Sequence, residues 1–404
     1  MLVMEMSRKE QQIPAIRFNG FTDAWEQRKF SNVVNRVSQQ SNDSNLPKVE
    51  FEDIVSGEGR LNKDISHKFD SRKGTVFEPE FILYGKLRPY LKNWLFPNFK
   101  GIALGDFWVF EPNNSSSIFD YYLIQSDKYQ TVANISSGTK MPRSDWKTVS
   151  ETVFSIPDSI NEQEKIGAFF KHLDNTIALH QRKLTLLKQL KQTYLQALFP
   201  QSELNIPTLR FARFSDSWEH RKVSSLAKET FGGGTPKTGV KKYWKGSFPW
   251  IQSSDLTTNQ LHNVQPTKFI TEEAIKQSAT HNVPGNSIAI VTRVGVGKLA
   301  LMRSSYSTSQ DFLSLSNLNV DAVFGVYCLY KMLQREVNNI QGTSIKGITK
   351  ADLLGKCVSV PTKVEEQVKI GAFFKKIDDT IDFHESKLKH ILELKKAFLE
   401  KMFL

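Results

Sequence analysis

The sequence predicts an α+β protein made by tandem duplication, with two β-rich mixed α/β domains and two long helices that pair antiparallel around a pseudo-two-fold axis. Three observations support this prediction. Residues 157–199 recur without a gap as residues 361–403, at a constant offset of 204. Residues 13–34 resemble residues 206–227, and the sequences between these shared segments are barely alike. The chain therefore carries two copies of one scaffold with two different inserts.

Composition limits the class of protein. A chain of 404 residues with 39% apolar residues is long enough for two or three packed domains. Its net charge of +12 and pI near 9.4 favour a polyanionic partner, most commonly nucleic acid. Cys328 and Cys357 have neither zinc-site spacing nor the density of a disulfide scaffold. The sequence shows no signal peptide and no apolar stretch long enough to cross a membrane, so we expect a cytoplasmic protein without membrane contact.

The repeated segments predict two helices. Their apolar residues recur on average every 3.5 positions, which is the period of a coiled coil. Neither segment contains an internal proline, and the single glycines, Gly167 and Gly371, stand near the start, where a close approach could use them. Helices of about 38 residues would each be roughly 57 Å long. The stripe continues to Leu190 and Leu198, and each stripe most simply packs against the other copy. The predicted interface comprises Phe170, Leu173, Ile177, His180, Leu184, Phe374, Ile377, Ile381, His384 and Leu388.

Two histidines occupy positions where this stripe predicts aliphatic residues. His180 and His384 either bond locally as tolerated polar residues or bring their imidazoles together at the centre of the helix pair. If they meet, the pairing should loosen below about pH 6, because both rings become charged. A comparison of the thermal midpoints of the wild type and a double leucine variant at about pH 7.5 and about pH 5.5 tests this hypothesis.

The inserts, roughly residues 35–150 and 228–356, contain short apolar or alternating runs separated by Gly, Asn and Pro turns, which favour β-rich domains. We therefore predict a first mixed domain over 1–156, a central helix over 157–200, a second mixed domain over 201–360 and a C-terminal helix over 361–404. Residues 201–210 are polar and contain proline, as expected of a linker between the halves.

The second insert opens with a glycine-rich segment, FGGGTPKTGVKKYWKGSFPWIQSSDL (231–256). Exposed amides and lysines there could bind phosphates while aromatic rings stack nearby, or the segment could be a structural turn followed by core aromatics. Its candidates are Gly233, Thr235, Lys237, Lys241, Lys242 and Tyr243. The segment TRVGVGKLALM (292–302) lacks the first glycine and the hydroxyl of a phosphate-binding loop. Arg293 and Lys298 are still candidate DNA contacts, with Ser309 and Gln310 as candidates for base edges.

In the first insert, the segment GKLRPYLKNW (85–94) interleaves basic and aromatic residues. This pattern is typical of nucleic-acid binding, although a solvated strand edge would look similar. Its candidates are Lys86, Arg88, Tyr90 and Lys92. Both inserts end in a comparable phrase, SGTKMPRSDWKTV (137–149) and QGTSIKGITKADL (341–353), which adds Lys140, Arg143, Lys346 and Lys350 as phosphate contacts or solvated loop charges. We assign the matched residues Trp25 and Trp218 to packing.

Motifs for catalysis are not found in the sequence. It has no Asn/Asp-Pro-Pro-aromatic motif for amino-group methylation, no glycine-rich turn suited to a methyl-donor cofactor and no metal-ligand spacing. We therefore expect a binding protein with no catalytic residue, metal or cofactor of its own. Composition and duplication alone indicate a bipartite nucleic-acid binder, and the main alternative is a free-standing spacer protein that binds nucleic acid.

Several motifs together resemble the specificity subunit of type I restriction-modification systems. They are the two copies of EQ-x-KIGAFFK, the GGTP-x-T and PWI-x-x-x-DL phrases, GKLRPYL, SQ-x-F and the two closing phrases. The first insert departs from the GGTP opening, with NRVSQQSNDSNLPKVEFEDI (35–54) in its place.

This resemblance implies a non-catalytic, sequence-specific subunit that binds double-stranded DNA. Each insert would be a target recognition domain for one half of a bipartite site, and the helices would set the spacer and dock the methyltransferase subunits. The resemblance also implies two modification subunits, which methylate adenine with S-adenosylmethionine, and two restriction subunits, which use ATP and Mg for translocation and cleavage.

Overall fold

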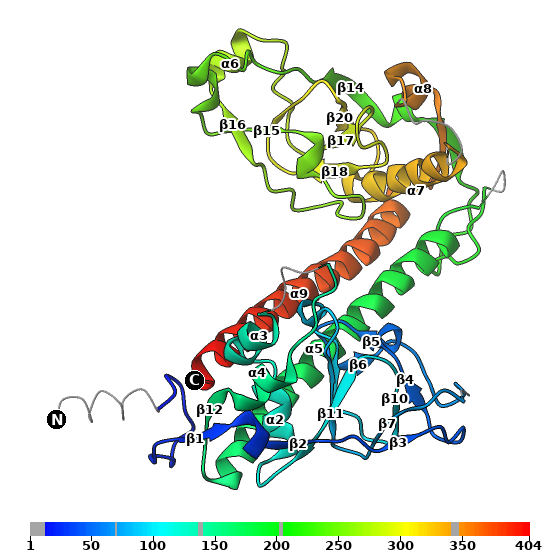
Figure 1. The fold of residues 1–404 in the computed structure, drawn as a ribbon. Coiled ribbons are helices and arrows are strands. Elements are labelled where there is room, and N and C mark those ends of the chain that lie inside the picture. Colours follow the sequence, from blue (N-terminus) through cyan, green and yellow to red (C-terminus); the bar gives the residue numbers. More distant parts are fainter. Residues whose placement is uncertain (1–12, 69–70, 136–139, 202–204, 341–346) are drawn as a thin grey trace. The chain divides into compact units, whose positions relative to one another are not determined.

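A computed structural model describes residues 13–68, 71–135, 140–201, 205–340 and 347–404, which form two compact units (Figure 1). Unit 1 consists of the described residues up to Arg182 together with Ser386–Leu404, and unit 2 is Lys183–Glu385. The division cuts both long helices, so each unit contains one mixed region, the first part of one helix and the last part of the other. The predicted tandem α+β organisation is confirmed.

Unit 1 is built on two small sheets. One has the strand order β2-β11-β8-β9, and the other has the order β3-β7-β10-β4, in which β10 and β4 are parallel. Strands β1 and β12 form a separate antiparallel pair. The elements, in order, are β1 (Glu26–Lys29), β2 (Val34–Arg36), β3 (Gln40–Ser41), β4 (Lys48–Val49), β5 (Ile54–Val55), β6 (Arg60–Leu61), β7 (Gly74–Phe77), β8 (Ile82–Gly85), β9 (Trp94–Leu95), β10 (Gly101–Ala103), β11 (Phe107–Pro112), α2 (Ser117–Leu123), α3 (Asp127–Ala133), α4 (Trp146–Glu151) and β12 (Val153–Ile156).

Unit 2 repeats the first sheet and the separate strand pair of unit 1 with a different sequence, whereas its second sheet has three strands in the order β16-β15-β19. The order β14-β20-β17-β18 matches the first sheet of unit 1, and β15 pairs in parallel with β19 as β4 pairs with β10. Strands β13 and β21 correspond to β1 and β12. The elements, in order, are β13 (Glu219–Lys222), β14 (Ala227–Gly232), β15 (Phe248–Ile251), β16 (Lys268–Ile270), α6 (Glu272–Lys276), β17 (Ser287–Val291), β18 (Leu299–Met302), β19 (Ser307–Thr308), β20 (Phe312–Leu318), α7 (Ala322–Ile340), α8 (Lys350–Gly355) and β21 (Cys357–Val360).

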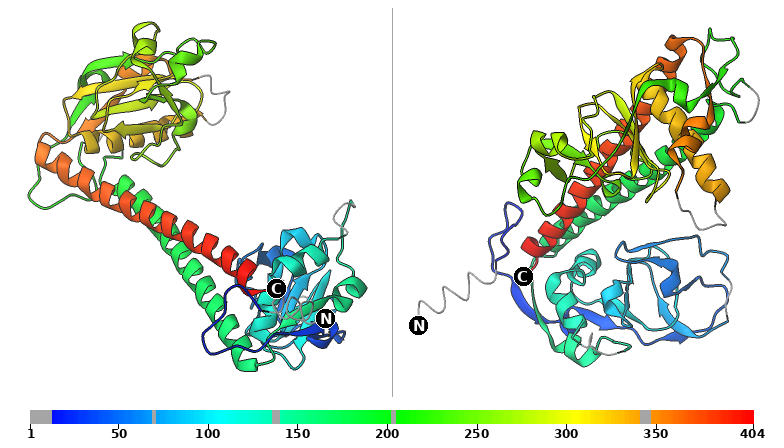
Figure 2. Two further views of the ribbon diagram at one scale, coloured as in Figure 1. Left: turned by 90° about the vertical axis from the view of Figure 1, so that its left-hand side faces the viewer. Right: turned by 90° about the horizontal axis from the view of Figure 1, so that it is seen from above.

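The two repeated segments form the long helices α5 (Ile160–Ala197, 38 residues) and α9 (Val364–Met402, 39 residues). This agrees with the helices of about 38 residues that the 3.5-residue period predicts. In unit 1 the last turns of α9 lie beside the first half of α5 (Figure 2), where the rings of Phe169 and Phe398 are 5.0 Å apart. In unit 2, Tyr194 of α5 and Phe373 of α9 make the equivalent contact at 4.9 Å. Within each unit the start of one helix therefore meets the end of the other, which makes the pairing antiparallel.

The residues predicted for the helix interface are all withdrawn from solvent. Leu173, His180 and Leu388 are half-buried, and the other seven are buried. The expected stripe fails at Leu190, which is 42% exposed, while its neighbour Lys191 is 7% exposed. A lysine therefore occupies the buried position on this turn. Contact between His180 and His384 stays a prediction, because one lies in each unit.

The start of each long helix is anchored by the same polar contacts. Arg17 donates two hydrogen bonds to Glu162, at 2.6 and 2.8 Å, and Arg210 donates two to Glu366, at 2.7 and 2.8 Å. Trp25, which is 1% exposed, packs edge-on against Phe119 behind the first of these pairs. Trp218 is 2% exposed in unit 2, so the packing role predicted for both tryptophans is confirmed.

The glycine near the start of each helix allows a close approach, as predicted. A Cβ placed on Gly167 would lie 2.5 Å from Cγ2 of Ile118. One placed on Gly371 would lie 2.8 Å from the backbone nitrogen of Phe324. The elements that approach are α2 and α7, so these glycines seat each long helix on the mixed region of its own unit.

Candidate nucleic-acid interface

In unit 1 the loop after β8 is held against the segment that precedes α4. The backbone N–H of Arg88 donates to the carbonyl of Pro142 at 2.7 Å, and Leu87 forms an antiparallel bridge with Arg143. Arg88 and Lys92 have left-handed backbone conformations, with φ of 50° and 55°, on either side of a short 3₁₀ turn. Residues with side chains rarely adopt this conformation. The structure therefore brings the candidates of 86–92 together with those of 140–143.

This surface of unit 1 carries more positive charge than its carboxylates neutralise. Asp106 forms an ion pair with Arg143 at 2.9 Å and lies 3.7 Å from the ammonium of Lys86. Arg88, Lys92 and Lys140 are exposed, and no described carboxylate pairs with them. Tyr90 is 51% exposed beside them. Exposed cations next to an exposed aromatic ring suit contact with phosphates and bases.

Unit 2 presents the corresponding loop after β17, the equivalent strand. Arg293 is exposed here, and the carbonyl of the preceding Thr292 accepts a hydrogen bond from Ile348 at 2.8 Å. Gly347 makes this contact possible, because its φ of 111° suits glycine and a Cβ there would lie 2.8 Å from the carbonyl oxygen of Thr292. The same two segments therefore meet in both units, although their sequences differ. Lys346 lies outside the described residues.

The glycine-rich segment approaches the SQ-x-F phrase closely. A Cβ on Gly233 would lie 1.8 Å from the carbonyl oxygen of Ser309, so only glycine fits there. Beyond it, the hydroxyl of Thr235 donates to Oε1 of Gln310 at 2.6 Å, and both side chains are exposed. Ser309 itself is 4% exposed. Thr235 and Gln310 are therefore accessible, as a contact with a base edge requires, whereas the burial of Ser309 does not support the contact predicted for it.

The remaining candidates of unit 2 are divided between surface and core. Lys237, Lys241 and Lys350 are exposed, and the ammonium of Lys350 lies against Gly232. Lys298 is half-buried and donates to the carbonyl of Ser253 at 3.0 Å, which holds two loops together.

Tyr243 and Lys242 depart from the expected roles. The ring of Tyr243 is 7% exposed and belongs to a small core with Trp250 and Ile270, so it is not placed to stack on a base. The alternative of a turn followed by core aromatics applies to this residue. Lys242 forms an ion pair with Glu273 at 2.6 Å, which offsets its charge.

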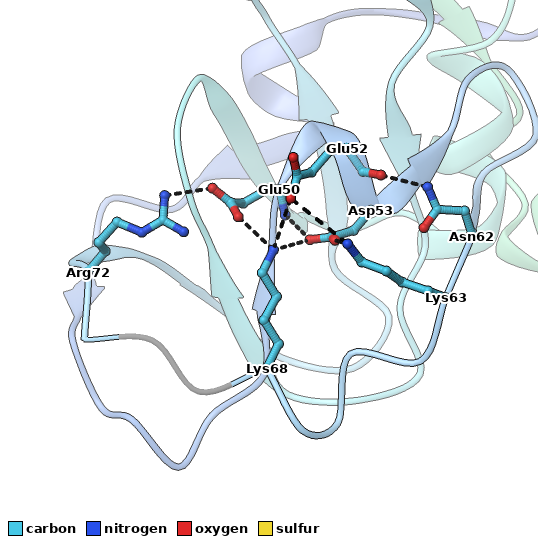
Figure 3. A network of polar contacts seen from close by, with 7 residues as sticks. All are labelled: Glu50, Glu52, Asp53, Asn62, Lys63, Lys68 and Arg72. Carbon is cyan, nitrogen blue, oxygen red and sulfur yellow. Dashed lines mark hydrogen bonds and ion pairs between the residues drawn. The ribbon is translucent and has the colours of Figure 1, made fainter.

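A network of charged residues in unit 1, drawn in Figure 3, was not predicted. Lys68 pairs with Glu50 at 2.6 Å and with Asp53 at 2.8 Å, while Lys63 also pairs with Asp53 at 2.8 Å. A hydrogen bond from Arg72 lowers the pKa of Glu50. Burial raises the pKa of Asp53, but hydrogen bonds from the two lysines outweigh burial and lower it. The network fastens Lys63, Lys68 and Arg72 to the turn at 51–53 and the preceding Glu50.

The turn that carries this network has a counterpart in unit 2. Asp53 accepts a hydrogen bond from the backbone N–H of Glu50 at 2.9 Å, and Asp255 accepts one from Gln252 at the same distance. The segment VEFEDI (49–54) is thus the structural equivalent of IQSSDL (251–256), although the first insert lacks the surrounding phrase. The shared aspartate, followed by an apolar residue, is the signal in the sequence that could have shown the match.

The described residues give no sign of a metal centre. Among them, no group of three or more His, Cys, Asp or Glu side chains is placed to hold a metal ion. None of the helices in the described part of the chain is long and apolar enough to cross a membrane.

Comparison with known proteins identifies relatives. The chain is 30% identical over 182 residues to the type I restriction enzyme MjaIX specificity subunit of Methanocaldococcus jannaschii, covering 44% of this chain and 41% of that protein. It is 28% identical over 217 residues to the EcoR124I/EcoR124II specificity subunit of Escherichia coli, covering 49% and 52%. The matches thus span about half the length of these relatives.

Solved structures agree on the fold. The S subunit of a type I restriction-modification system from M. genitalium superposes with a TM-score of 0.66 and 13% identity, covering 97% of this chain and 99% of that one. A chain of another type I R-M system gives a TM-score of 0.53 with 18% identity, covering 95% and 98%.

The family model for the type I restriction modification DNA specificity domain matches residues 25–189 and again residues 215–393. Together the two matches cover most of the chain and correspond to its two repeats. The chain therefore belongs to the family of type I restriction-modification DNA specificity proteins, with two such domains in tandem.

Proposed function

We propose that this chain is the sequence-specific DNA-binding subunit of a type I restriction-modification complex, in which each unit recognises one half of a bipartite site. One observation carries the proposal: two units with the same strand order in their first sheet use the same two segments to present basic residues, yet differ in sequence there. Arg88 follows β8 in unit 1 and Arg293 follows β17 in unit 2, each beside the segment that precedes α4 or α8. A shared frame with different surface residues suits the recognition of two different sequences.

The long helices would set the distance between the two half-sites and dock the methyltransferase subunits. The chain would act without a catalytic centre, metal or cofactor of its own. Two modification subunits would methylate adenine with S-adenosylmethionine, and two restriction subunits would use ATP and Mg. The assembly would act on double-stranded DNA in the cytoplasm.

Coexpression of the chain with its modification subunits, followed by mapping of methylated adenines in the host genome, tests this proposal. We expect methylation at one bipartite sequence with a fixed spacer, and none without this chain. Recovery of the chain bound to nucleic acid but without a methyltransferase would favour the alternative of a free-standing spacer protein. Methylation or cleavage by the isolated chain would contradict a non-catalytic role.

The salt dependence of DNA binding gives a second test of the proposal. If exposed lysines and arginines bind phosphates, the logarithm of the association constant should fall linearly with the logarithm of salt concentration. Alanine at Lys92 or Lys140 should reduce that slope by about one for each phosphate that the side chain neutralises.

A further inference from the structure

A partly buried polar cluster in unit 1 joins α2 to both long helices. The hydroxyl of Tyr122 donates to Oδ2 of Asp174 at 2.9 Å, and the ammonium of Lys395 forms an ion pair with Oδ1 of Asp174 at 2.6 Å. The same ammonium lies 5.6 Å from the centre of the Tyr122 ring. The three residues come from α2, α5 and α9, so the cluster fixes all three elements together.

Unit 2 contains the same cluster, made from the equivalent residues. The hydroxyl of Tyr327 donates to Oδ2 of Asp378 at 2.7 Å, and Lys191 forms an ion pair with Oδ1 of Asp378 at 2.6 Å. The Lys191 ammonium again lies 5.6 Å from the tyrosine ring. Asp378 and Lys395 stand 204 positions after Asp174 and Lys191, which is the offset of the duplication. In each unit, therefore, the aspartate comes from that repeat's own helix and the lysine from the helix of the other repeat.

The charged side chains of both clusters are largely shielded from solvent, so each charge depends on its partner for stability. The side chains of Lys191 and Asp378 are 9% and 11% exposed, and those of Lys395 and Asp174 are 12% and 25% exposed. A buried charge that loses its partner is strongly destabilising, whereas apolar stripes with a repeating period tolerate a shift along the helix. Burial raises the pKa of both tyrosines, so their hydroxyls stay protonated donors. The clusters thus select one placement of each long helix on each mixed region.

The surroundings of the two clusters differ. In unit 1 the ammonium of Lys395 also donates to Oε1 of Gln125 at 3.2 Å. In unit 2 the position equivalent to Gln125 is Tyr330, whose hydroxyl donates to Asn259 at 2.8 Å. Residues 257–262 therefore close over the second cluster, beside a cavity of about 530 Å³. In unit 1 the segment after the equivalent turn makes different contacts, since Glu58 accepts a hydrogen bond from Gln181 of α5 at 3.2 Å.

We propose that Lys395 and Lys191 are positioning residues for DNA recognition, and that each holds the recognition surface of the other repeat in place on the helix pair. This inference rests on the proposed function. It predicts a crossed dependence: Lys395 belongs to the second repeat, yet it governs recognition of the half-site bound by unit 1. Lys191 belongs to the first repeat and governs the half-site bound by unit 2.

The test uses the full chain assembled with its modification subunits and duplexes that carry a mismatch in one half-site or the other. The half-site of unit 1 is the one whose recognition Arg88→Ala weakens. We expect Lys395→Met to reduce discrimination at that half-site about tenfold or more, and to leave the other within about twofold. Lys191→Met should do the reverse. The matched control is Lys188→Met, which removes an exposed lysine of α5, the helix that also carries Lys191. Lys188 pairs with Glu385 of α9 on the surface, so its loss should change neither half-site.

A double variant separates positioning from general loss of folding. Asp174→Asn combined with Lys395→Met removes both charges of the cluster and keeps an acceptor for the tyrosine hydroxyl, so it should recover most of the lost discrimination. Equal loss at both half-sites in Lys395→Met, or loss confined to the half-site of unit 2, would overturn the proposal.

Hydrogen exchange gives a readout that does not depend on DNA. Lys395→Met should speed exchange in α2, and Lys191→Met should speed exchange in α7, with the other unit unchanged. If the wild type shows no bipartite recognition, the proposed function fails while this measurement still decides the positioning role. Unchanged exchange in both helices would contradict it.

Discussion

At the scale of single residues, Arg88 and Arg293 offer the most direct access to recognition. Each follows an equivalent strand, is exposed and has no described carboxylate partner. We predict that Arg88→Ala and Arg293→Ala each weaken one half-site by about 1–3 kcal/mol, or roughly 5- to 150-fold, because alanine cannot bind the base or phosphate that the guanidinium reaches. Binding to duplexes with single half-site changes measures this effect.

The control for these two variants is Lys29→Ala, an exposed lysine on β1 that pairs with Glu151. It should leave binding nearly unchanged, because the pair is solvated and lies outside the candidate surface. Should both arginine variants bind every duplex like the wild type, the loops after β8 and β17 would not be the recognition surface.

The buried His262 should make the stability of unit 2 depend on pH. Its Nε2 lies 3.0 Å from the hydroxyl of Tyr327, and burial, together with Lys375 and other nearby cations, lowers its pKa from 6.5 to about 4. The folded unit therefore holds this ring neutral while the unfolded chain protonates it. Its contribution to stability is complete above about pH 6.5 and is lost as pH falls towards about 4, by about 2–3 kcal/mol.

Chemical unfolding of the wild type and His262→Gln at about pH 7 and about pH 4.5 measures this contribution. Glutamine keeps a donor for the tyrosine but does not titrate, so the variant should lose less stability between the two values. Identical losses in both proteins would show that His262 is already accessible to protons in the folded state.

At the scale of elements, the glycines at the helix starts test how tightly each long helix is seated. We predict that Gly167→Ala destabilises unit 1 by about 1–3 kcal/mol, because the new Cβ would press on Ile118, and alanine's better helix propensity recovers at most about 1 kcal/mol. Thermal unfolding measures the change. Gly355→Ala is the control, since a Cβ added there would meet no atom within 4 Å. Equal thermal midpoints for the wild type and the two variants would mean that α2 moves aside without a loss of stability.

The elements differ in how far the sequence alone predicts them. The helices α5 and α9 could be predicted because their apolar residues repeat every 3.5 positions. The packing role of the two tryptophans could be predicted from their matched positions in the two repeats. Both signals are local in the sequence. The buried Lys191 was missed, since a lysine beside Leu190 ordinarily faces solvent and only its partners across three elements explain its burial. The turn at Asp53 was missed because its sequence shares little with the turn at Asp255 beyond the aspartate and the apolar residue that follows it. So short a signal does not stand out until the surrounding strands are matched.

The candidate surface was predicted in part. The sequence indicated the basic loops, and the structure brings 86–92 to 140–143 and places Arg293 beside Gly347. It did not indicate which aromatic residues are exposed. Tyr90 and Tyr243 both stand among lysines in the sequence, yet one is exposed and the other belongs to a core. That distinction depends on tertiary packing, which residue patterns do not specify.

At the scale of the whole molecule, each unit contains a helix segment from the other repeat, and this predicts how an isolated first half of the chain would associate. Unit 1 is completed by Ser386–Leu404, which the first half lacks. The equivalent residues of α5 include Lys191 in place of Lys395, so a second copy can supply them. We predict that a fragment of residues 1–200 forms a dimer that binds a symmetric site, as sedimentation and DNA binding would measure. Lys191→Met should weaken that dimer, and a stable monomeric fragment would count against this prediction.

The central claim is that the paired helices set the distance between two recognition surfaces. Deleting residues 179–185 and 383–389 removes one heptad from each helix and keeps both Tyr-Asp-Lys clusters, since these lie on either side of the deletions. Each helix shortens by about 10 Å, which corresponds to roughly 3 base pairs. Mapping the methylated sites of the assembled complex should show the same two half-sites with a spacer about 3 base pairs shorter. Methylation of the original sequence with its original spacer would contradict the account.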